Sequence, residues 1–103
     1  MRKLVRDGKV AVLISTGFGA GWYSWHRIQE LLFDPDIVKM IELDWPRDRI
    51  LAHCEKFYGN DHYFGGADGL VIHWVSEGAK FRIDEYDGSE TLILQTEDEW
   101  LIA

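Results

Sequence analysis

The strongest feature of the hydrophobic pattern is an unbroken apolar run at residues 10–14. A strand with one wet face alternates apolar and polar residues, so a run without alternation predicts a strand that is covered on both faces and central in its sheet. Just before this run, Asp7-Gly8 separates it from residues 3–6, and this dipeptide readily takes positive φ. We therefore expect an N-terminal β-hairpin whose second strand is central.

Helical spacing follows the apolar strand. Residues 24–32 place Trp25, Ile28 and Leu31 on one face, and Ser24 is a suitable N-cap for this helix. Asp34-Pro35 predicts an N-cap followed by proline in the first turn of a second, short helix.

Pro46 predicts the start of a third helix, and Gly59 is well placed to end it. Five residues form its apolar stripe: Ile50, Leu51, Cys54, Phe57 and Tyr58. These helices are short, and we expect them to pack on one face of the sheet.

Strand patterns return at residues 70–75, 80–86 and 91–95, and residues 99–103 are a candidate for a final strand. Asp87-Gly88 is a second hairpin signal between two of these strands. Because the strands are grouped at both ends of the chain with the helices between them, the order predicts an α+β fold rather than a doubly wound parallel sheet. We expect a single domain over residues 1–103: a mostly antiparallel sheet with an N-terminal hairpin, two or three short helices on one face, and C-terminal strands.

The net charge and the aromatic content narrow the classes of partner. A formal net charge of −7 argues against binding to a nucleic-acid backbone, because such binding needs Lys and Arg to displace counterions. Five Trp, four Tyr and five Phe are many for a chain of 103 residues, whose small core cannot easily bury them all. We expect some of them at a ligand site or at a subunit interface of a homo-oligomer.

Acidic residues dominate the end of the chain. After Arg82 come seven carboxylates and no further Lys or Arg: Asp84, Glu85, Asp87, Glu90, Glu97, Asp98 and Glu99. We expect them either to pair with the basic N-terminal residues or to form a solvated acidic face. The single cysteine excludes an internal disulfide, and no apolar run has the length that spans a bilayer or the form of a signal peptide. We expect a cytoplasmic protein that does not bind membranes.

Residues 15–25 combine glycines and aromatic residues directly after the apolar strand. Glycines at alternate positions let the backbone turn sharply and approach a ligand, and the start of the following helix would suit an anion. The segment does not match the dinucleotide fingerprint, which needs Gly or Ala where Trp22 stands, and it has no P-loop lysine. The candidate ligand-binding residues here are Gly17, Phe18, Gly19, Gly21, Trp22, Tyr23, Trp25 and Arg27. The alternative is a tight turn whose aromatic side chains fill the core or an interface.

A second loop, residues 59–69, has the same combination of residue types. If the two loops lie together, a planar base could stack on their rings while polar groups read its edge. The candidates from this loop are Asn60, Asp61, His62, Tyr63 and Phe64. The alternative is a solvent-exposed connection. A ribose or phosphate would need cations, and the available ones are Arg27, Arg47, Arg49, Lys80 and Arg82.

Candidate chemistry beyond binding is weak. The four histidines and Cys54 lack the paired spacing of a metal site, so we expect no metal and no cofactor. Cys54 lies on an apolar stripe, which is typical of an inert buried thiol. A hydrolase centred on Asp61, His62 and Asp68 is the best enzymatic hypothesis, but no nucleophile accompanies it. We therefore assign no catalytic residue and expect a binding protein rather than an enzyme.

Three segments of the chain form a recognisable pattern: Ser-Thr-Gly-Phe-Gly-Ala-Gly-Trp at residues 15–22 with Trp25, Leu-Phe-Asp-Pro at residues 32–35, and Asp-Glu-Trp-Leu at residues 98–101. In this pattern the chain resembles a family of small phage- and prophage-encoded proteins of unknown function. The resemblance spans most of the chain, but it implies no activity and no site residues. It implies a setting in the host cytoplasm, where small acidic phage proteins often bind host enzymes or the nucleotide signals of antiviral defence.

In that setting we predict a phage accessory protein that binds, and in the stronger form of the hypothesis sequesters, a nucleotide-derived small molecule through its two glycine- and aromatic-rich loops. Flexible glycines, stacking rings and few catalytic groups fit binding better than turnover. The alternative is an interaction protein or acidic inhibitor that contacts a host protein through exposed tryptophans and its acidic C-terminal half. A small hydrolase ranks third.

Overall fold

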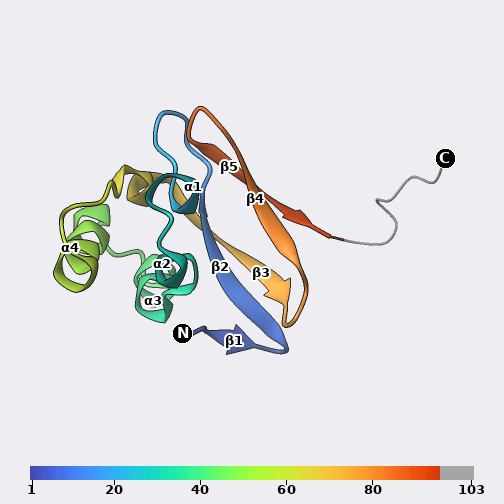
Figure 1. Cartoon of the computed structure of the whole chain (residues 1–103). Helices are drawn as coiled ribbons and strands as arrows, with labels where there is room; N and C mark the ends of the chain where they lie inside the picture. The colour runs from blue at the N-terminus through green and yellow to red at the C-terminus, as the bar shows by residue number, and fades with distance from the viewer. Residues whose placement is uncertain (96–103) are drawn as a thin grey trace.

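The computed structural model describes residues 1–95, which form an α+β fold in three layers (Figure 1). The strands are β1 (Val5–Arg6), β2 (Lys9–Ser15), β3 (Leu70–Ser76), β4 (Phe81–Tyr86) and β5 (Ser89–Leu94). The helices in this part of the chain are α1 (Tyr23–His26), α2 (Gln29–Phe33), α3 (Pro35–Glu42) and α4 (Arg47–Tyr58), followed by a 3₁₀ turn, η1 (Gly65–Gly69). The predicted α+β class with an N-terminal hairpin is confirmed, and the candidate strand at residues 99–103 lies outside the described residues.

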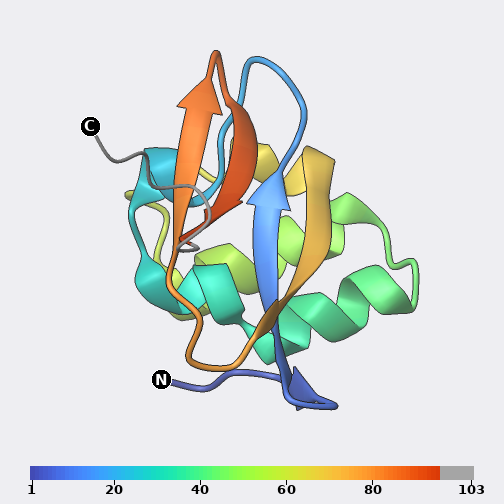
Figure 2. The same cartoon turned by 90° about the vertical axis from the view of Figure 1, so that its right-hand side faces the viewer.

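An antiparallel sheet in the order β1-β2-β3 forms the middle layer, and the β4–β5 hairpin is a separate two-stranded sheet (Figures 1 and 2). Residues 10–14 of strand β2 are all apolar and buried, and neither face of the strand meets water there. Ala11 and Leu13 belong to the core cluster that Ile50 of α4 joins. Val12, on the opposite face, packs with Ile83 of the hairpin. The prediction of a central strand covered on both faces is therefore confirmed.

Both predicted hairpin turns are present. Asp7 and Gly8 take φ angles of 51° and 76°, and Asp87 and Gly88 take 49° and 88°. Consecutive positive φ values give the turn whose twist matches paired strands, and Asp-Gly accepts them at low cost. Gly88 also lies so close to the backbone of Ala20 that a Cβ would overlap it. The second turn is therefore in direct contact with the first glycine-rich loop.

The single helix expected over residues 24–32 is instead two short helices, α1 and α2. Arg27 interrupts them with a φ of 62°, in the left-handed region. The ring of His26 accepts a hydrogen bond from the Ile28 N–H at 2.9 Å through Nδ1, and such a local bond competes with helix continuation. Ser24 is not the N-cap, since Trp22 holds that position and Ser24 lies inside α1. The break sets the position of Arg27.

Helix α3 begins as predicted. Asp34 is its N-cap, and its Oδ1 accepts from the N–H groups of Asp36 and Ile37 at 2.9 and 3.3 Å. Pro35 follows in the first turn, where its missing N–H costs no hydrogen bond. The basic N-terminal residues pair with this helix, as Arg2 contacts Asp36 at 3.1 Å and Arg6 makes two hydrogen bonds to Glu42. These two arginines therefore do not pair with the acidic residues after Arg82.

Helix α4 runs from Arg47 to Tyr58 and ends at Gly59, which takes a φ of 83°. Its predicted apolar stripe is only partly buried. Ile50 and Cys54 are in the core, whereas Leu51 and Phe57 are 38% and 62% exposed. Helix α4 has 12 residues, and no helix within residues 1–95 is long and apolar enough to cross a membrane.

Candidate functional site

The two glycine- and aromatic-rich loops lie side by side. The Thr16 N–H donates to the Gly69 carbonyl at 3.1 Å. Gly66 packs so tightly on the backbone of Gly21 and Trp22 that a Cβ would overlap the Gly21 carbonyl group. Glycine is therefore required at position 66 for the loops to approach each other. This juxtaposition is the condition on which the binding hypothesis for the loops depended.

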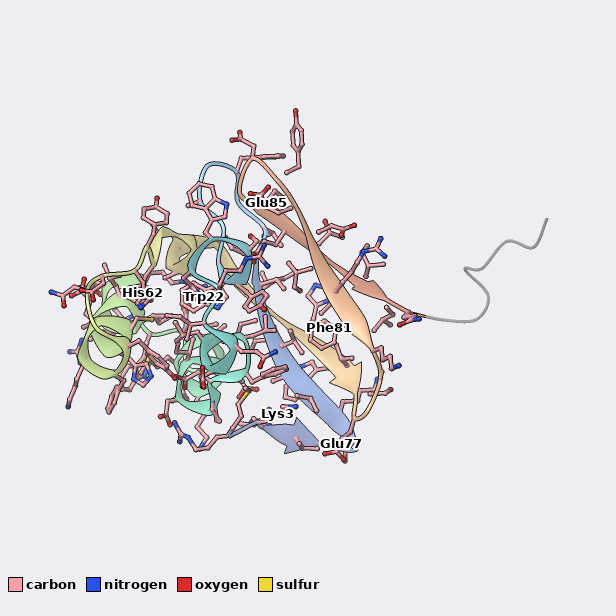
Figure 3. All side chains as sticks on the ribbon, in the orientation of Figure 1. Lys3, Trp22, His62, Glu77, Phe81 and Glu85 are labelled. Atoms are coloured by element: carbon pink, nitrogen blue, oxygen red, sulfur yellow. The ribbon has the colours of Figure 1, made fainter. Side chains whose placement is uncertain are left out.

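Trp22 and Phe64 form the buried centre of this contact. Trp22 is fully buried, and its indole N–H donates to the Leu31 carbonyl at 3.1 Å. Phe64 is 4% exposed, with its ring centroid 6.5 Å from that of Trp22. Figure 3 shows Trp22 inside the molecule, between the helices and the sheet. Neither ring presents a face to a ligand, and both pack in the core.

His26 lies beside these two rings. Its ring meets the Trp22 ring edge-on, with centroids 4.7 Å apart. Burial disfavours the imidazolium and lowers the pKa of His26 to about 4, with a smaller contribution from His62. His26 is therefore a neutral core residue at physiological pH.

The anion expected at the start of the first helix is the protein's own Glu90. This carboxylate is 2% exposed, and its Oε1 accepts from the Ser15 N–H at 2.9 Å. Its Oε2 accepts from the N–H and the hydroxyl of Ser24 at 2.9 and 2.5 Å. The Gly19 N–H donates to the Asp87 carbonyl at 2.5 Å. These loop N–H groups therefore bind the β4–β5 hairpin rather than an external ligand.

Three aromatic candidates from the loops stay at the surface. Phe18, Trp25 and Tyr63 are 72%, 41% and 52% exposed. The ring centroids of Trp25 and Tyr63 are 5.2 Å apart, and the Trp25 indole N–H donates to Glu85 Oε2 at 2.7 Å. The other exposed candidates are Gly17, Gly19, Asn60, Asp61 and His62, whereas Gly21 is buried.

The remaining two candidates, Tyr23 and Arg27, line a groove of about 900 Å³ between α1–α2 and β4. Figure 3 labels Lys3 and Phe81, which also line it. Among residues 1–95, the lining consists of Met1, Lys3, Tyr23, Arg27, Gln29, Leu32, Phe33, Ala79, Lys80, Phe81, Arg82, Ile83 and Gln95. We call this hollow the cationic groove.

The cationic groove carries positive charge on an acidic protein. Four of the eleven Lys and Arg residues line it, and these described lining residues include no Asp or Glu. One of the four, Arg82, is ion-paired with Asp84 at 2.9 Å. The Lys3 ammonium lies 4.6 Å from the centre of the Phe33 ring, and the Arg27 guanidinium lies 5.8 Å from that of Tyr23. Cations at aromatic faces suit a ligand that has both negative charge and a flat apolar part.

The sequence predicted some of the residues that line this groove. Arg27, Lys80 and Arg82 were among the candidate cations, but Lys3 and Phe33 were not recognised. The alternation of basic and aromatic residues in Lys-Phe-Arg at residues 80–82 was the available signal.

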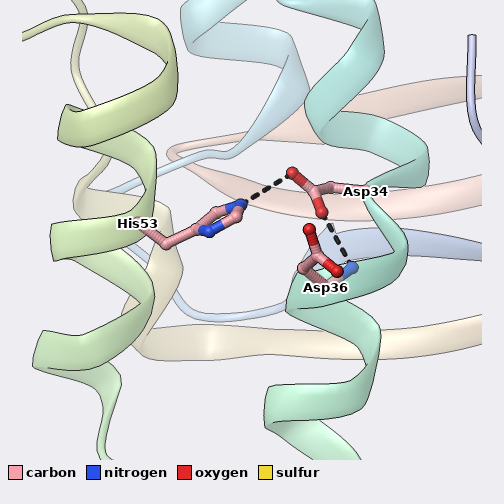
Figure 4. Close-up of side chains that lie close together, drawn as sticks. All are labelled: Asp34, Asp36 and His53. Atoms are coloured by element: carbon pink, nitrogen blue, oxygen red, sulfur yellow. Dashed lines mark hydrogen bonds and ion pairs between the residues drawn. The ribbon is translucent and has the colours of Figure 1, made fainter.

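A cluster of possible metal ligands lies elsewhere, between α3 and α4 (Figure 4). Ligand atoms of Asp34, Asp36 and His53 lie within 4.8 Å of one another. The buried Asp34 caps α3 with Oδ1, while its Oδ2 lies 2.9 Å from His53 Nε2 and accepts from the Tyr58 hydroxyl at 3.1 Å. Both oxygens of Asp34 are therefore already engaged, and the cluster ties α3 to α4. Burial and the nearby Asp34 raise the pKa of Tyr58, which keeps its hydroxyl a donor.

The described residues offer little for catalysis. Cys54 is fully buried, and burial raises the pKa of its thiol to about 12, so no thiolate is present at neutral pH. Asp61, His62 and Asp68 are exposed, and no hydrogen bond within residues 1–95 joins them. The hydrolase hypothesis therefore gains no support from the geometry.

The cationic groove is the best candidate site for a small molecule, because it combines volume, charge and ring faces. The two loops that the sequence favoured position its residues on α1. Comparisons with protein-family models, with curated proteins and with solved structures gave no match for this chain.

Proposed function

We propose that this protein binds an anionic small molecule of the nucleotide class in the cationic groove and holds it without chemical change. The supporting observation is the charge of the groove. A chain of net charge −7 gathers four of its eleven basic side chains around one hollow whose described lining has no carboxylate. Arg82 is ion-paired with Asp84, so the proposal depends on Lys3, Arg27 and Lys80, which form no ion pair within residues 1–95. Phosphate oxygens form strong charge-assisted hydrogen bonds with such groups.

The shape and the apolar lining favour a nucleotide over a simple inorganic anion. A volume of about 900 Å³ is far more than one phosphate fills and lies in the range of small-molecule sites. Tyr23 and Phe81, which are partly exposed, supply aromatic surface on which a planar base can stack. The phosphates would then lie toward Lys80 and Arg27.

The glycine-rich loops serve this site indirectly. Glu90 holds Ser24 in α1, and the indole of Trp22 is fixed beneath the same helix. Tyr23 is the first residue of α1, and Arg27 is its left-handed C-cap. The internal anion and the buried tryptophan therefore set the position of two groove residues.

The residue types that line the groove favour binding without turnover as the proposal. Its described lining contains no His, Cys, Asp or Glu that would serve as an ordinary general base or nucleophile. We therefore propose sequestration, in the setting that the phage resemblance implies: a reducing host cytoplasm in which the bound nucleotide is a signal. A homo-oligomer is part of this proposal, and light scattering of the purified protein tests it.

Thermal unfolding in the presence of linear and cyclic nucleotides tests the proposal. A ligand present at 100 times its dissociation constant adds about 2.7 kcal/mol to the stability of the native state. For a domain of this size, that gain raises the melting temperature by about 10 °C or more. Product analysis by chromatography after the same incubation should return the nucleotide unchanged.

A matched pair of charge reversals locates the site. Lys80 makes no side-chain hydrogen bond or ion pair within residues 1–95, so Lys80→Glu should leave the fold unchanged and weaken binding about tenfold. Lys56→Glu changes the net charge equally on α4, away from the groove, and should bind like the wild type. No stabilisation by any nucleotide, or an equal loss in both variants, would contradict binding in the groove.

A further inference from the structure

A second surface, at one end of the molecule, exposes four aromatic side chains. Phe18, Trp25, Tyr63 and Tyr86 are 72%, 41%, 52% and 78% exposed, and we call them the aromatic tip. Figures 1 and 2 show the loop after β2 and the turn between β4 and β5 side by side at this end. Exposed aromatic residues gathered in one place are typical of protein-binding surfaces.

Contacts within the protein hold two of the four rings, Trp25 and Tyr63, in place. The Trp25 and Tyr63 rings pack at 5.2 Å between centroids, and Glu85 accepts from the Trp25 indole at 2.7 Å. The neighbour of Phe18, Gly19, donates from its N–H to Asp87 in the hairpin turn. Because these contacts exist before any partner arrives, binding would cost little conformational entropy at Trp25 and Tyr63.

The charge at the aromatic tip is opposite to that of the cationic groove. The segments that carry the four aromatic residues, 16–25, 61–64 and 84–89, contain Asp61, Asp84, Glu85 and Asp87 but no Lys or Arg. Asp84 is ion-paired with Arg82 of the same strand, so the acidic character depends on the other three. All four of these carboxylates are on exposed residues. Nucleotide phosphates would be repelled here, whereas a basic partner would be attracted.

We propose that the aromatic tip docks an arginine-bearing segment of a partner protein. Arginine fits better than lysine, since its planar guanidinium stacks on aromatic faces and forms two parallel hydrogen bonds with a carboxylate. Tyr86 is the most exposed of the four rings, and Asp87 follows it in the hairpin turn. Glu85, whose side chain leaves the strand on the opposite face from Tyr86, lies at Trp25. This proposal is independent of the cationic groove and holds whether or not the protein binds a nucleotide.

The test is an NMR titration of the full chain, labelled with ¹⁵N, with two synthetic peptides of equal charge: four Gly-Arg repeats and four Gly-Lys repeats. We expect the arginine peptide to shift the Trp25 indole N–H signal saturably and to bind at least fivefold more tightly than the lysine peptide. Equal affinities of the two peptides would mean that the surface attracts any positive charge, and this result would overturn the proposal.

Variants that keep the net charge separate stacking from charge. Phe18→Ser combined with Tyr86→Ser should weaken the arginine peptide at least tenfold, while Phe57→Ser, which removes an exposed ring from α4, should leave its affinity unchanged. If the double variant does not fold, Tyr86→Ser alone should weaken binding at least threefold. Wild-type affinity in a folded tip variant would refute docking at these rings.

Discussion

Replacing Glu90 with glutamine should strongly destabilise the protein, although the two side chains have nearly the same size. The Glu90 carboxylate is 2% exposed and accepts three hydrogen bonds, one from Ser15 and two from Ser24. Glutamine keeps one acceptor oxygen, which can still serve Ser15. Its amide group, however, would face the Ser24 N–H, and two donors cannot bond to each other.

The expected cost follows from the bonds that are lost. A hydrogen bond to a charged group contributes about 1.5–3 kcal/mol, and an unsatisfied buried donor adds a desolvation penalty. Ser24 can turn its hydroxyl to accept from the new amide, so only part of the interaction is lost. We expect a loss of about 3 kcal/mol in the free energy of unfolding and a melting temperature lower by about 10–25 °C.

Urea unfolding followed by tryptophan fluorescence measures this loss, with an unchanged slope showing that the same surface is exposed. Glu85→Gln is the control, because Glu85 is exposed on the same hairpin, and it should cost less than about 1 kcal/mol. A double-mutant cycle with Ser24→Ala should give a coupling energy of at least about 1 kcal/mol. If Glu90→Gln is as stable as the control, the carboxylate does not anchor the loop.

Three further outcomes follow from the buried groups. Trp22→Ala should lower the free energy of unfolding by about 3–5 kcal/mol, because Trp22 is fully buried, and Trp22→Phe should lower it clearly less. If chemical denaturation gives equal and small losses for both variants, Trp22 is not a core residue. The pKa of His26 is about 4 in the folded protein and 6.5 in the unfolded chain, so the unfolded state binds a proton more readily as the pH falls. The free energy of unfolding should therefore be lower by about 2 kcal/mol at pH 5 and by about 3 kcal/mol at pH 4 than at neutral pH. His26→Asn should lack this part of the decline, and identical pH profiles of the two proteins would contradict a buried neutral imidazole. Asp34→Asn keeps the cap oxygen but loses the acceptor for Tyr58, so calorimetry should show a loss of about 1–3 kcal/mol in stability. Asp36→Asn is the control, because Asp36 is only partly buried, and it should cost under about 1 kcal/mol.

Local signals in the sequence predicted much of the fold. Asp7-Gly8 and Asp87-Gly88 adopt the positive φ angles that such turns need, and Asp34 caps α3 through bonds to its next neighbours. The apolar strand β2 is covered on both faces. Each of these features depends on a few adjacent residues or on one strand's own pattern, so it is visible without the tertiary structure.

Features that depend on distant residues were not predictable in the same way. The position of α1 depends on Glu90, which is 66 residues from Ser24 in the chain, and sequence reasoning placed Glu90 in a run of acidic residues that either pair with the N-terminus or face solvent. The loops were expected to bind an anion, and the groups that would do so instead bind this internal carboxylate. Spacing alone does not distinguish an internal anion from an external one.

The cationic groove is a stronger example of the same limit. Its described lining comes from the N-terminal residues, from α1 and α2 with Arg27 between them, from β4 with its preceding turn, and from Gln95 after β5. Lys3 and Lys80 are 77 positions apart, and only the packing of the hairpin against the sheet places them around one hollow. Sequence reasoning named the residue types correctly but had no means of choosing among the cations.

Mapping a stabilising nucleotide onto the protein by ¹⁵N NMR is the most direct measurement of where it binds. If the cationic groove is the site, amide signals of Arg27, Lys80 and Phe81 shift saturably, and Lys80→Glu moves the midpoint to about tenfold higher ligand concentration. The opposite result is shifts confined to Phe18 and the loop at residues 59–64, with the Lys80→Glu variant binding like the wild type. It would contradict binding in the cationic groove and favour a site at the two glycine- and aromatic-rich loops.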